Sequence, residues 1–146
     1  MKSLLVLIAL AGSTAFAADI TVTNAKIFAP IQGSNTTAGY GVIKNTSKKT
    51  VTIKAVEAKP FTAIELHETK EKDGRMSMQK MEQITLEPGK EFELKQGGNH
   101  IMLFDATSKV EANQKITVKL LVNNKEESFE IPVVPRTVKK EEEHHH

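Results

Sequence analysis

Near its middle the chain reads Phe61-Thr62-Ala63-Ile64-Glu65-Leu66-His67, a run in which apolar and polar side chains alternate. Alternation with a period of two, in segments rich in Val, Ile and Thr, is typical of half-buried β-strands. The same pattern recurs in four other segments, at residues 20–23, 51–56, 116–120 and 129–131. No window shows a sustained helical period, so the sequence predicts an all-β protein.

Turn-forming residues separate these strands. Gly, Pro and Asn gather at residues 30–33, 45–49, 73–74, 88–89, 96–98 and 123–124. Short strands spaced about ten residues apart, with such turns between them, are typical of an antiparallel sandwich or a Greek-key barrel. Residues 18–135 show neither an internal repeat nor a domain boundary, and we therefore expect a single domain there.

The two ends of the chain differ from this central part. Residues 1–17 have the form of a secretory signal peptide, with Lys2, an apolar run and Ala15-Phe16-Ala17 before the expected cleavage site. The apolar run is too short for a bilayer, which needs about 20 residues. Residues 136–146 are highly charged, so we expect a disordered tail. Its last residues, His144–His146, are either the remnant of a purification tag or a native metal-binding tail, and the sequence leaves both open.

Composition excludes several classes of protein. Removal of residues 1–17 lowers the formal net charge from +2 to +1, and the basic residues are spread out. The chain has one Tyr and no Trp to stack on bases, so we expect no binding to nucleic acid. No segment after the leader is long and apolar enough to span a membrane. The absence of cysteine excludes disulfides, Cys-rich zinc sites and the thiolate-ligated blue-copper site.

Histidine and methionine are concentrated in one part of the chain. Apart from the leader and the last three residues, both histidines and all four methionines lie between residues 67 and 102. Ten residues separate His67 from Met78, twenty-one separate Met78 from His100, and one separates His100 from Met102. We regard the two histidines, Met102 and the pair Met76 and Met78 as candidate metal ligands. A lone Met on a strand is more often part of the core, and we favour that role for Met81.

The segment around His100 is expected to separate ligands from core. Residues two apart in a strand share a face, so His100 and Met102 should project together. Ile101 and Leu103 should project the other way, into the core.

A hairpin is expected to bring the other candidates near. Asp73-Gly74 is typical of a tight turn between two antiparallel strands. Such a turn places the strand that ends near His67 beside the strand that carries Met76 and Met78. If the strand of His100 lies next to this hairpin, four soft or borderline ligands converge.

The donor set favours copper. Thioether sulfur is a soft donor that suits Cu(I) and does little for hard cations. Two histidines without a closely placed carboxylate make a poor zinc set, although Glu65 shares the face of His67. Imidazole and thioether without thiolate should bind Cu(I) firmly and still exchange ligands readily, which suits a carrier.

The spacing of His67, Met78, His100 and Met102 resembles the signature of the periplasmic copper chaperone family known as PCu(A)C. The segments around these residues are also similar to that family, and the resemblance extends from the first strand to about residue 134. It implies a cupredoxin-like Greek-key β-barrel or sandwich with an exposed Cu(I) site near one end, formed by those four residues. Many members carry another Met close after the first His, where this chain has Glu68-Thr69.

The resemblance further implies a periplasmic copper metallochaperone. Its partners would be cytochrome c oxidase subunit II, which carries the CuA centre, and Sco-type proteins. A weaker second site for Cu(II) would depend on His144–His146. We expect a monomer and no enzymatic activity, because no catalytic triad or paired-carboxylate arrangement is evident. Two alternatives stay open, a copper-buffering or resistance protein without a delivery partner and a β-sandwich adhesion or assembly module without metal.

Overall fold

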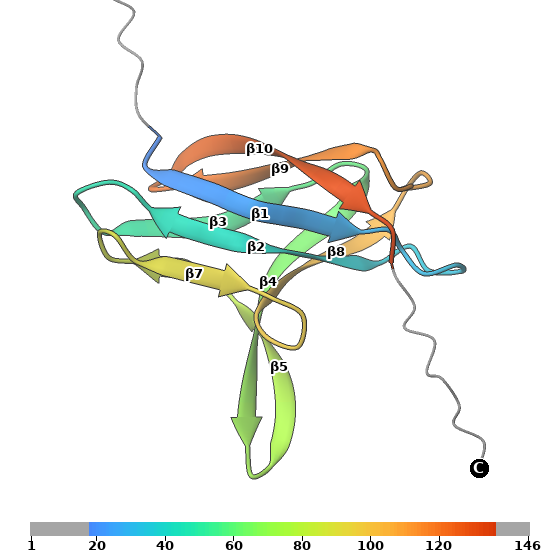
Figure 1. Ribbon diagram of the computed structural model, residues 1–146, viewed down its shortest axis with the longest axis horizontal. Helices are drawn as coiled ribbons and strands as arrows, with labels where there is room; N and C mark the ends of the chain where they lie inside the picture. Colours follow the sequence, from blue (N-terminus) through green and yellow to red (C-terminus); the bar gives the residue numbers. More distant parts are fainter. Residues whose placement is uncertain (1–17, 137–146) are drawn as a thin grey trace, which may run out of the picture.

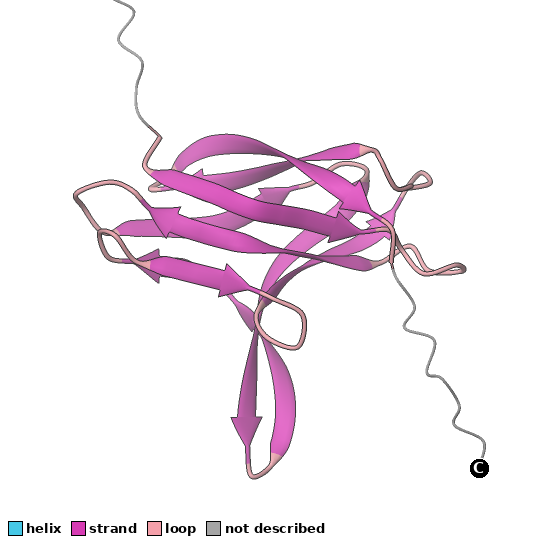
Figure 2. Ribbon diagram, in the orientation of Figure 1, coloured by secondary structure: helices cyan, strands magenta, loops and turns pink. Residues whose placement is uncertain are grey.

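The computed structural model describes residues 18–136, and every regular element within this range is a β-strand (Figure 2). Ten strands follow one another along the chain: β1 (Ile20–Phe28), β2 (Thr37–Asn45), β3 (Val51–Glu57), β4 (Phe61–Lys72), β5 (Arg75–Met81), β6 (Ile84–Leu86), β7 (Glu91–Leu94), β8 (His100–Ala106), β9 (Lys115–Val122) and β10 (Lys125–Val134). All five predicted alternating segments lie within strands, and each predicted turn lies at a junction between two of them. The prediction of an all-β single domain is confirmed.

The expected leader and residues 137–146 of the expected tail lie outside the described residues. Arg136, the first residue of that tail, lies over the ring of Phe28, with 5.4 Å between the guanidinium and the ring centre. It also donates a hydrogen bond to Thr37 Oγ1 at 3.3 Å. Residues 18–136 contain no helix that is long and apolar enough to cross a membrane.

The strands form two layers that pack face to face (Figure 1). One layer has the order β5-β4-β8-β2-β1, and the other has the order β10-β9-β3-β6. A short parallel pairing of β1 with β10 joins the layers, which is an exception to the predicted antiparallel arrangement. β2 pairs with β8 near its start and with β7 near its end. The chain therefore passes from β7 to β8 through a loop that lies along β2.

The core fills the space between the two layers. Leu66 of β4 and Leu103 of β8 are almost fully buried there, at 2% and 0% exposure. Apolar side chains of β3 and β9, such as Ile53 and Leu120, are part of the same cluster. Burying a side chain of this size stabilises the fold by about 1.5–3 kcal/mol. The inner faces of β4 and β8 are thus held in place, and this fixes their outer faces as well.

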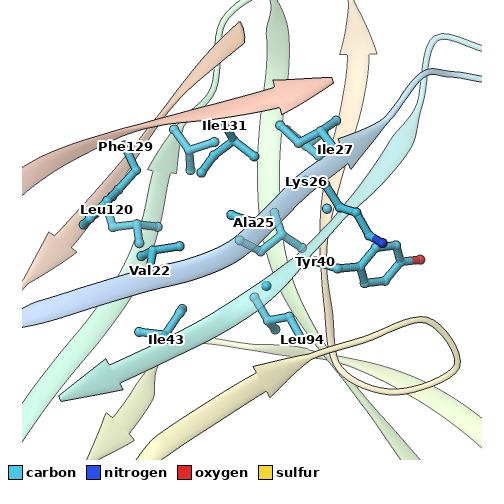
Figure 3. A pocket seen from close by; sticks show the side chains of 15 residues that line it. Val22, Ala25, Lys26, Ile27, Tyr40, Ile43, Leu94, Leu120, Phe129 and Ile131 are labelled. Atoms are coloured by element: carbon cyan, nitrogen blue, oxygen red, sulfur yellow. The ribbon is translucent and has the colours of Figure 1, made fainter. Parts of the chain in front are cut away.

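A small apolar cavity of about 40 Å³ remains inside the core beneath β1 (Figure 3). Side chains from both layers surround it, including Val22 and Ile43 from one layer and Leu120 and Ile131 from the other. Ile101 and Leu103 also line it. The cavity therefore lies on the inner face of β8, opposite the side chains of His100 and Met102.

A bulge in β1 passes close to a glycine of β2. The pairing register of β1 with β2 shifts between Thr23 and Lys26, and Asn24 has a φ of 52°. A Cβ atom on Gly41 would lie 3.0 Å from the Cα atom of Ala25. Only a glycine at this position lets the bulged backbone pack against β2 without displacement.

Candidate metal centre

The two histidines lie side by side on the outer face of the first layer. β4 and β8 are antiparallel in a register that pairs His67 directly with His100. Their ring centres are 5.5 Å apart and the rings are inclined by 39°. Met102 lies two residues further along β8 and shares the face of His100, whereas the adjacent Leu103 is buried. The predicted orientation is confirmed, with His100 and Met102 on one face of the strand and Leu103 in the core.

The β4–β5 hairpin carries two methionines to the same face. Its turn is Asp73-Gly74, with φ angles of 53° and 73°, as a two-residue type I′ turn requires. The hairpin register pairs Met78 with Thr69, which lies two residues beyond His67 in β4. Residues paired directly across two strands project from the same face, so Met78 and Met76 both project on the side of His67. The predicted hairpin is confirmed, although its first strand continues to Lys72 instead of ending near His67.

Met81 projects to the other side of the same strand. It pairs with Leu66 and packs partly buried against the core. The odd spacing between Met78 and Met81 turns the two side chains to opposite faces. The prediction that Met81 belongs to the core is confirmed.

A surface hollow of about 480 Å³ lies where the hairpin meets β8 and β2. Four side chains with possible metal-binding atoms line it: His100 and Met102 from β8, and Met76 and Met78 from β5. The other lining residues are Ala38, Tyr40, Thr69, Gly97 and Gly98. His67 is not among the lining residues and lies beside the hollow, next to His100. The structure thus gathers three of the four predicted ligands around one hollow, with the fourth adjacent.

His100 is held in one tautomer by its surroundings. His100 is 7% exposed, and its Nδ1 donates a hydrogen bond to the carbonyl oxygen of Gly98 at 2.9 Å. A carbonyl oxygen can only accept, so Nδ1 carries the hydrogen and Nε2 of the neutral ring has a free lone pair. Ligating histidines commonly have their second nitrogen bound to a carbonyl or carboxylate in this way.

His67 is oriented by a carboxylate instead. Its Nε2 donates to Glu65 Oε2 at 2.7 Å, and the Lys80 ammonium lies 3.7 Å from the other carboxylate oxygen. The hydrogen bond from His67 lowers the pKa of the Glu65 carboxyl below its ordinary value; burial opposes this, and the positive charge of Lys80 adds to it. With Nε2 engaged, Nδ1 is the nitrogen of His67 that is free to bind an ion.

Thr69 and Asn99 attach the β7–β8 loop to the hairpin. The Thr69 hydroxyl donates to the carbonyl oxygen of Gly98 at 2.8 Å, and the Thr69 amide donates to Asn99 Oδ1 at 3.3 Å. The carbonyl oxygen that orients His100 is therefore itself held by β4. Sequence reasoning missed this contact, because residues 69 and 98 are distant in the chain and only the folded loop brings them together.

Thioethers are the soft donors around the hollow, and no carboxylate accompanies them. Its lining contains thioethers, an imidazole, a phenol and a hydroxyl, and no carboxylate. Burial raises the pKa of the Tyr40 phenol, against the opposing influence of Arg136, so this side chain stays protonated at neutral pH. No group of three or more His, Cys, Asp or Glu side chains in residues 18–136 is arranged to hold a metal ion. A metal at this site would depend on sulfur from methionine.

Comparison with known sequences gives a family and a relative. The family model described as "LpqE-like: Putative lipoprotein LpqE-like" matches residues 20–133. A protein of Leifsonia xyli subsp. xyli (strain CTCB07), named "Putative lipoprotein Lxx21020", is 34% identical to this chain over 96 residues. The match covers 65% of this chain and 58% of the Leifsonia protein, so the chain spans little more than half the length of that relative.

Several solved structures are similar in fold. The apo PCuAC domain from PmoF1 has a TM-score of 0.68 and 18% identity, over 82% of this chain and 96% of that domain. The copper-bound PCuAC domain from PmoF2 has a TM-score of 0.68 and 17% identity, over 83% and 97%. Apo-DR1885 from Deinococcus radiodurans has a TM-score of 0.60 and 23% identity, over 93% and 92%. Similarity at these identities establishes the fold, and the predicted cupredoxin-like architecture is confirmed.

Proposed function

Because this chain belongs to the LpqE-like family and presents imidazole and thioether side chains on one face of a cupredoxin-like sheet, we propose that it is a copper metallochaperone that acts outside the cytoplasm. It takes Cu(I) as its cargo. The ligands are His67, Met78, His100 and Met102.

The observation that carries this proposal is the strand register. The pairing of His67 with His100 and of Met78 with Thr69 directs donors from three strands to one face, although they are up to 35 positions apart in the sequence. A purely structural role gives Met78 no reason to project into solvent beside these histidines. Met78 is 65% exposed, so its position is not explained by burial of its apolar side chain.

The chemistry of the donors selects the ion. Hard divalent cations such as Ca²⁺ and Mg²⁺ bind through oxygen, chiefly from carboxylates, and the hollow offers no carboxylate. Thioether and neutral imidazole suit Cu(I), whereas Cu(II) prefers tetragonal nitrogen and oxygen ligands. The fold shared with the copper-bound PCuAC domain from PmoF2 supports copper as the metal.

Delivery to a partner is supported by the openness of the site. Donors on a protruding hairpin (Figure 1) can be approached by a second protein and replaced one at a time. We expect the acceptor to be cytochrome c oxidase subunit II, with its CuA centre, alongside Sco-type proteins. We expect a binding role and no enzymatic activity, with one histidine oriented by a carboxylate and the other by a carbonyl oxygen.

A location outside the cytoplasm is supported by the expected signal peptide at residues 1–17 and by the lipoprotein names of the family and of the Leifsonia relative. In a bacterium with two membranes this compartment is the periplasm. The sequence contains no cysteine whose sulfur could carry a lipid.

Anaerobic titration with Cu(I) in competition with a chromophoric chelator tests the proposal. The wild-type chain should bind one equivalent, and Met78→Leu or His100→Ala should weaken binding with little change in fold. Met81→Leu is the matched control, because it removes a thioether from the same strand on the opposite face. Equal Cu(I) affinity in the wild type and in a variant lacking all four ligands would refute the assignment.

A further inference from the structure

Met76 is a donor that the four-ligand site does not use. Met76 is 62% exposed. It and Met78 are two of only four large hydrophobic side chains that are exposed in residues 18–136. The other two, Ile31 and Val56, lie elsewhere in the fold and have no metal-binding chemistry. Met76 thus combines a soft donor atom with open access to solvent.

The position of Met76 relative to the site is set by the hairpin. Met76 and Met78 project from the same face of β5 and line the same hollow as His100 and Met102. Residues two apart in a strand are separated by about 7 Å, and two flexible Met side chains at that distance can reach a common ion. Met76 lies nearer the Asp73-Gly74 turn than Met78 does, so its thioether is the one closest to the hairpin tip.

Packing does not account for Met76. The same strand has a methionine that does pack, because Met81 turns inward and contacts the core. Met76 is absent from the core cluster and from the partly buried side chains that surround it. Its exposed apolar surface costs solvation free energy without gaining contacts.

We propose that Met76 is an exchange ligand, which holds Cu(I) transiently as the ion enters or leaves the site formed by His67, Met78, His100 and Met102. The step is a ligand substitution in which one sulfur–copper bond forms as another bond to copper breaks, and copper stays in the +1 state. This inference rests on the proposed function. It adds a route of transfer across the hairpin tip, where the donor or acceptor protein would dock.

An exchange ligand affects rate and affinity differently. A contact made only while the ion is moving lowers the barrier to transfer, and it leaves the affinity of the resting complex nearly unchanged. A fifth permanent ligand would instead raise the affinity. A side chain with no metal contact would change neither quantity.

The experiment compares Met76→Leu with Met81→Leu and the wild type, all loaded anaerobically with Cu(I). Competition with bicinchoninate measures affinity, and stopped-flow mixing with excess bathocuproine disulfonate measures the rate of removal. We expect the Cu(I) affinity of Met76→Leu to stay within about threefold of the wild type. We expect the variant to lose copper about tenfold more slowly, because the activation barrier to removal is higher. Met81→Leu should match the wild type in both measurements. Met76→His, which restores a copper donor, should recover most of the rate.

Three results would overturn the inference in different ways. A removal rate for Met76→Leu within about twofold of the wild type would show that Met76 takes no part in exchange. A loss of affinity of about tenfold or more would make Met76 a resting ligand. A wild-type chain that binds no Cu(I) would overturn the proposed function itself, and this outcome is visible before any variant is compared.

Discussion

Replacing Leu103 with Ala should destabilise the fold strongly and leave the candidate copper site almost intact. Leu103 and Met102 are neighbours in β8, yet Leu103 is fully buried in the core and Met102 lines the outer hollow. If the strand separates core from site as described, the two positions should respond to substitution in opposite ways. Leu103→Ala tests the first half of this statement and Met102→Leu tests the second.

The size of the Leu103→Ala effect follows from burial and from the adjoining cavity. The substitution removes three buried carbon atoms, which costs about 2.4 kcal/mol at about 0.8 kcal/mol each. Leu103 already borders a cavity of about 40 Å³, so we expect the space left by the substitution to join that cavity and to be filled only in part by neighbouring side chains. A residual void of about 50 Å³ adds about 1.2 kcal/mol at about 24 cal/mol per Å³. We expect a total loss near 3.5 kcal/mol and a fall in Tm of about 10–15 °C.

Met102→Leu should give the reverse result. The two side chains have similar volumes, so the stability change should stay below about 1.5 kcal/mol. Structural zinc sites with four ligands contribute about 10–16 kcal/mol, so one ligand of four carries about 3 kcal/mol. Loss of the Met102 thioether should therefore weaken Cu(I) binding by about hundredfold or slightly more.

Urea unfolding of the metal-free variants measures the first effect, and chelator competition well below the unfolding transition measures the second. Leu103→Met serves as a control, since it keeps the volume of the side chain. A stability loss for Leu103→Ala of less than about 1 kcal/mol would refute the described packing of β8. A large loss of Cu(I) affinity in Leu103→Ala, with none in Met102→Leu, would refute the assignment of the two faces.

Three further outcomes are expected. Both imidazoles must be neutral to bind copper, because the ion and the proton compete for the same nitrogen lone pair, so Cu(I) affinity should decline on acidification and level off at the thioether contribution; a flat profile would contradict histidine ligation. Glu65→Gln removes the carboxylate that orients His67 and should lower Cu(I) affinity by about tenfold or more without unfolding the domain, as chelator competition and circular dichroism can show. The hydrogen bond from Lys119 holds the pKa of Glu57 below its ordinary value of 4.5, so the stabilisation is present above that pH and is lost on acidification; thermal unfolding of Glu57→Gln should depend less on pH between about 5 and 3 than that of the wild type.

Much of the fold could be predicted because its signals are local. Alternation identified β1, β3, β4, β9 and β10, and the Asp73-Gly74 turn identified the hairpin of β4 and β5. β2 was harder to recognise, because Gly39 and Gly41 interrupt its pattern of apolar side chains. The reason for Gly41 lies in another strand, where the β1 bulge approaches it, and no local pattern reveals such a contact.

The candidate site divides in the same way. The spacing of the histidines and methionines singled out the four candidate ligands, and strand periodicity correctly separated Met78 from Met81. The hydrogen bond that Glu65 accepts from His67 could have been anticipated in part, since the two residues share a face. The support of His100 by Gly98 could not, because it depends on how the β7–β8 loop folds back onto β4.

The amino-acid sequence by itself determined which segments are strands, where they turn, which side chains alternate between core and surface, and which soft donors the chain carries. These properties depend on neighbours within a few residues. Only the tertiary structure decided that His67 faces His100, that Met76 and Met78 share a hollow with Met102, and which nitrogen of each imidazole stays free. Those features depend on the register between distant strands, and a shift of one residue in that register would turn every donor of a strand to the opposite face.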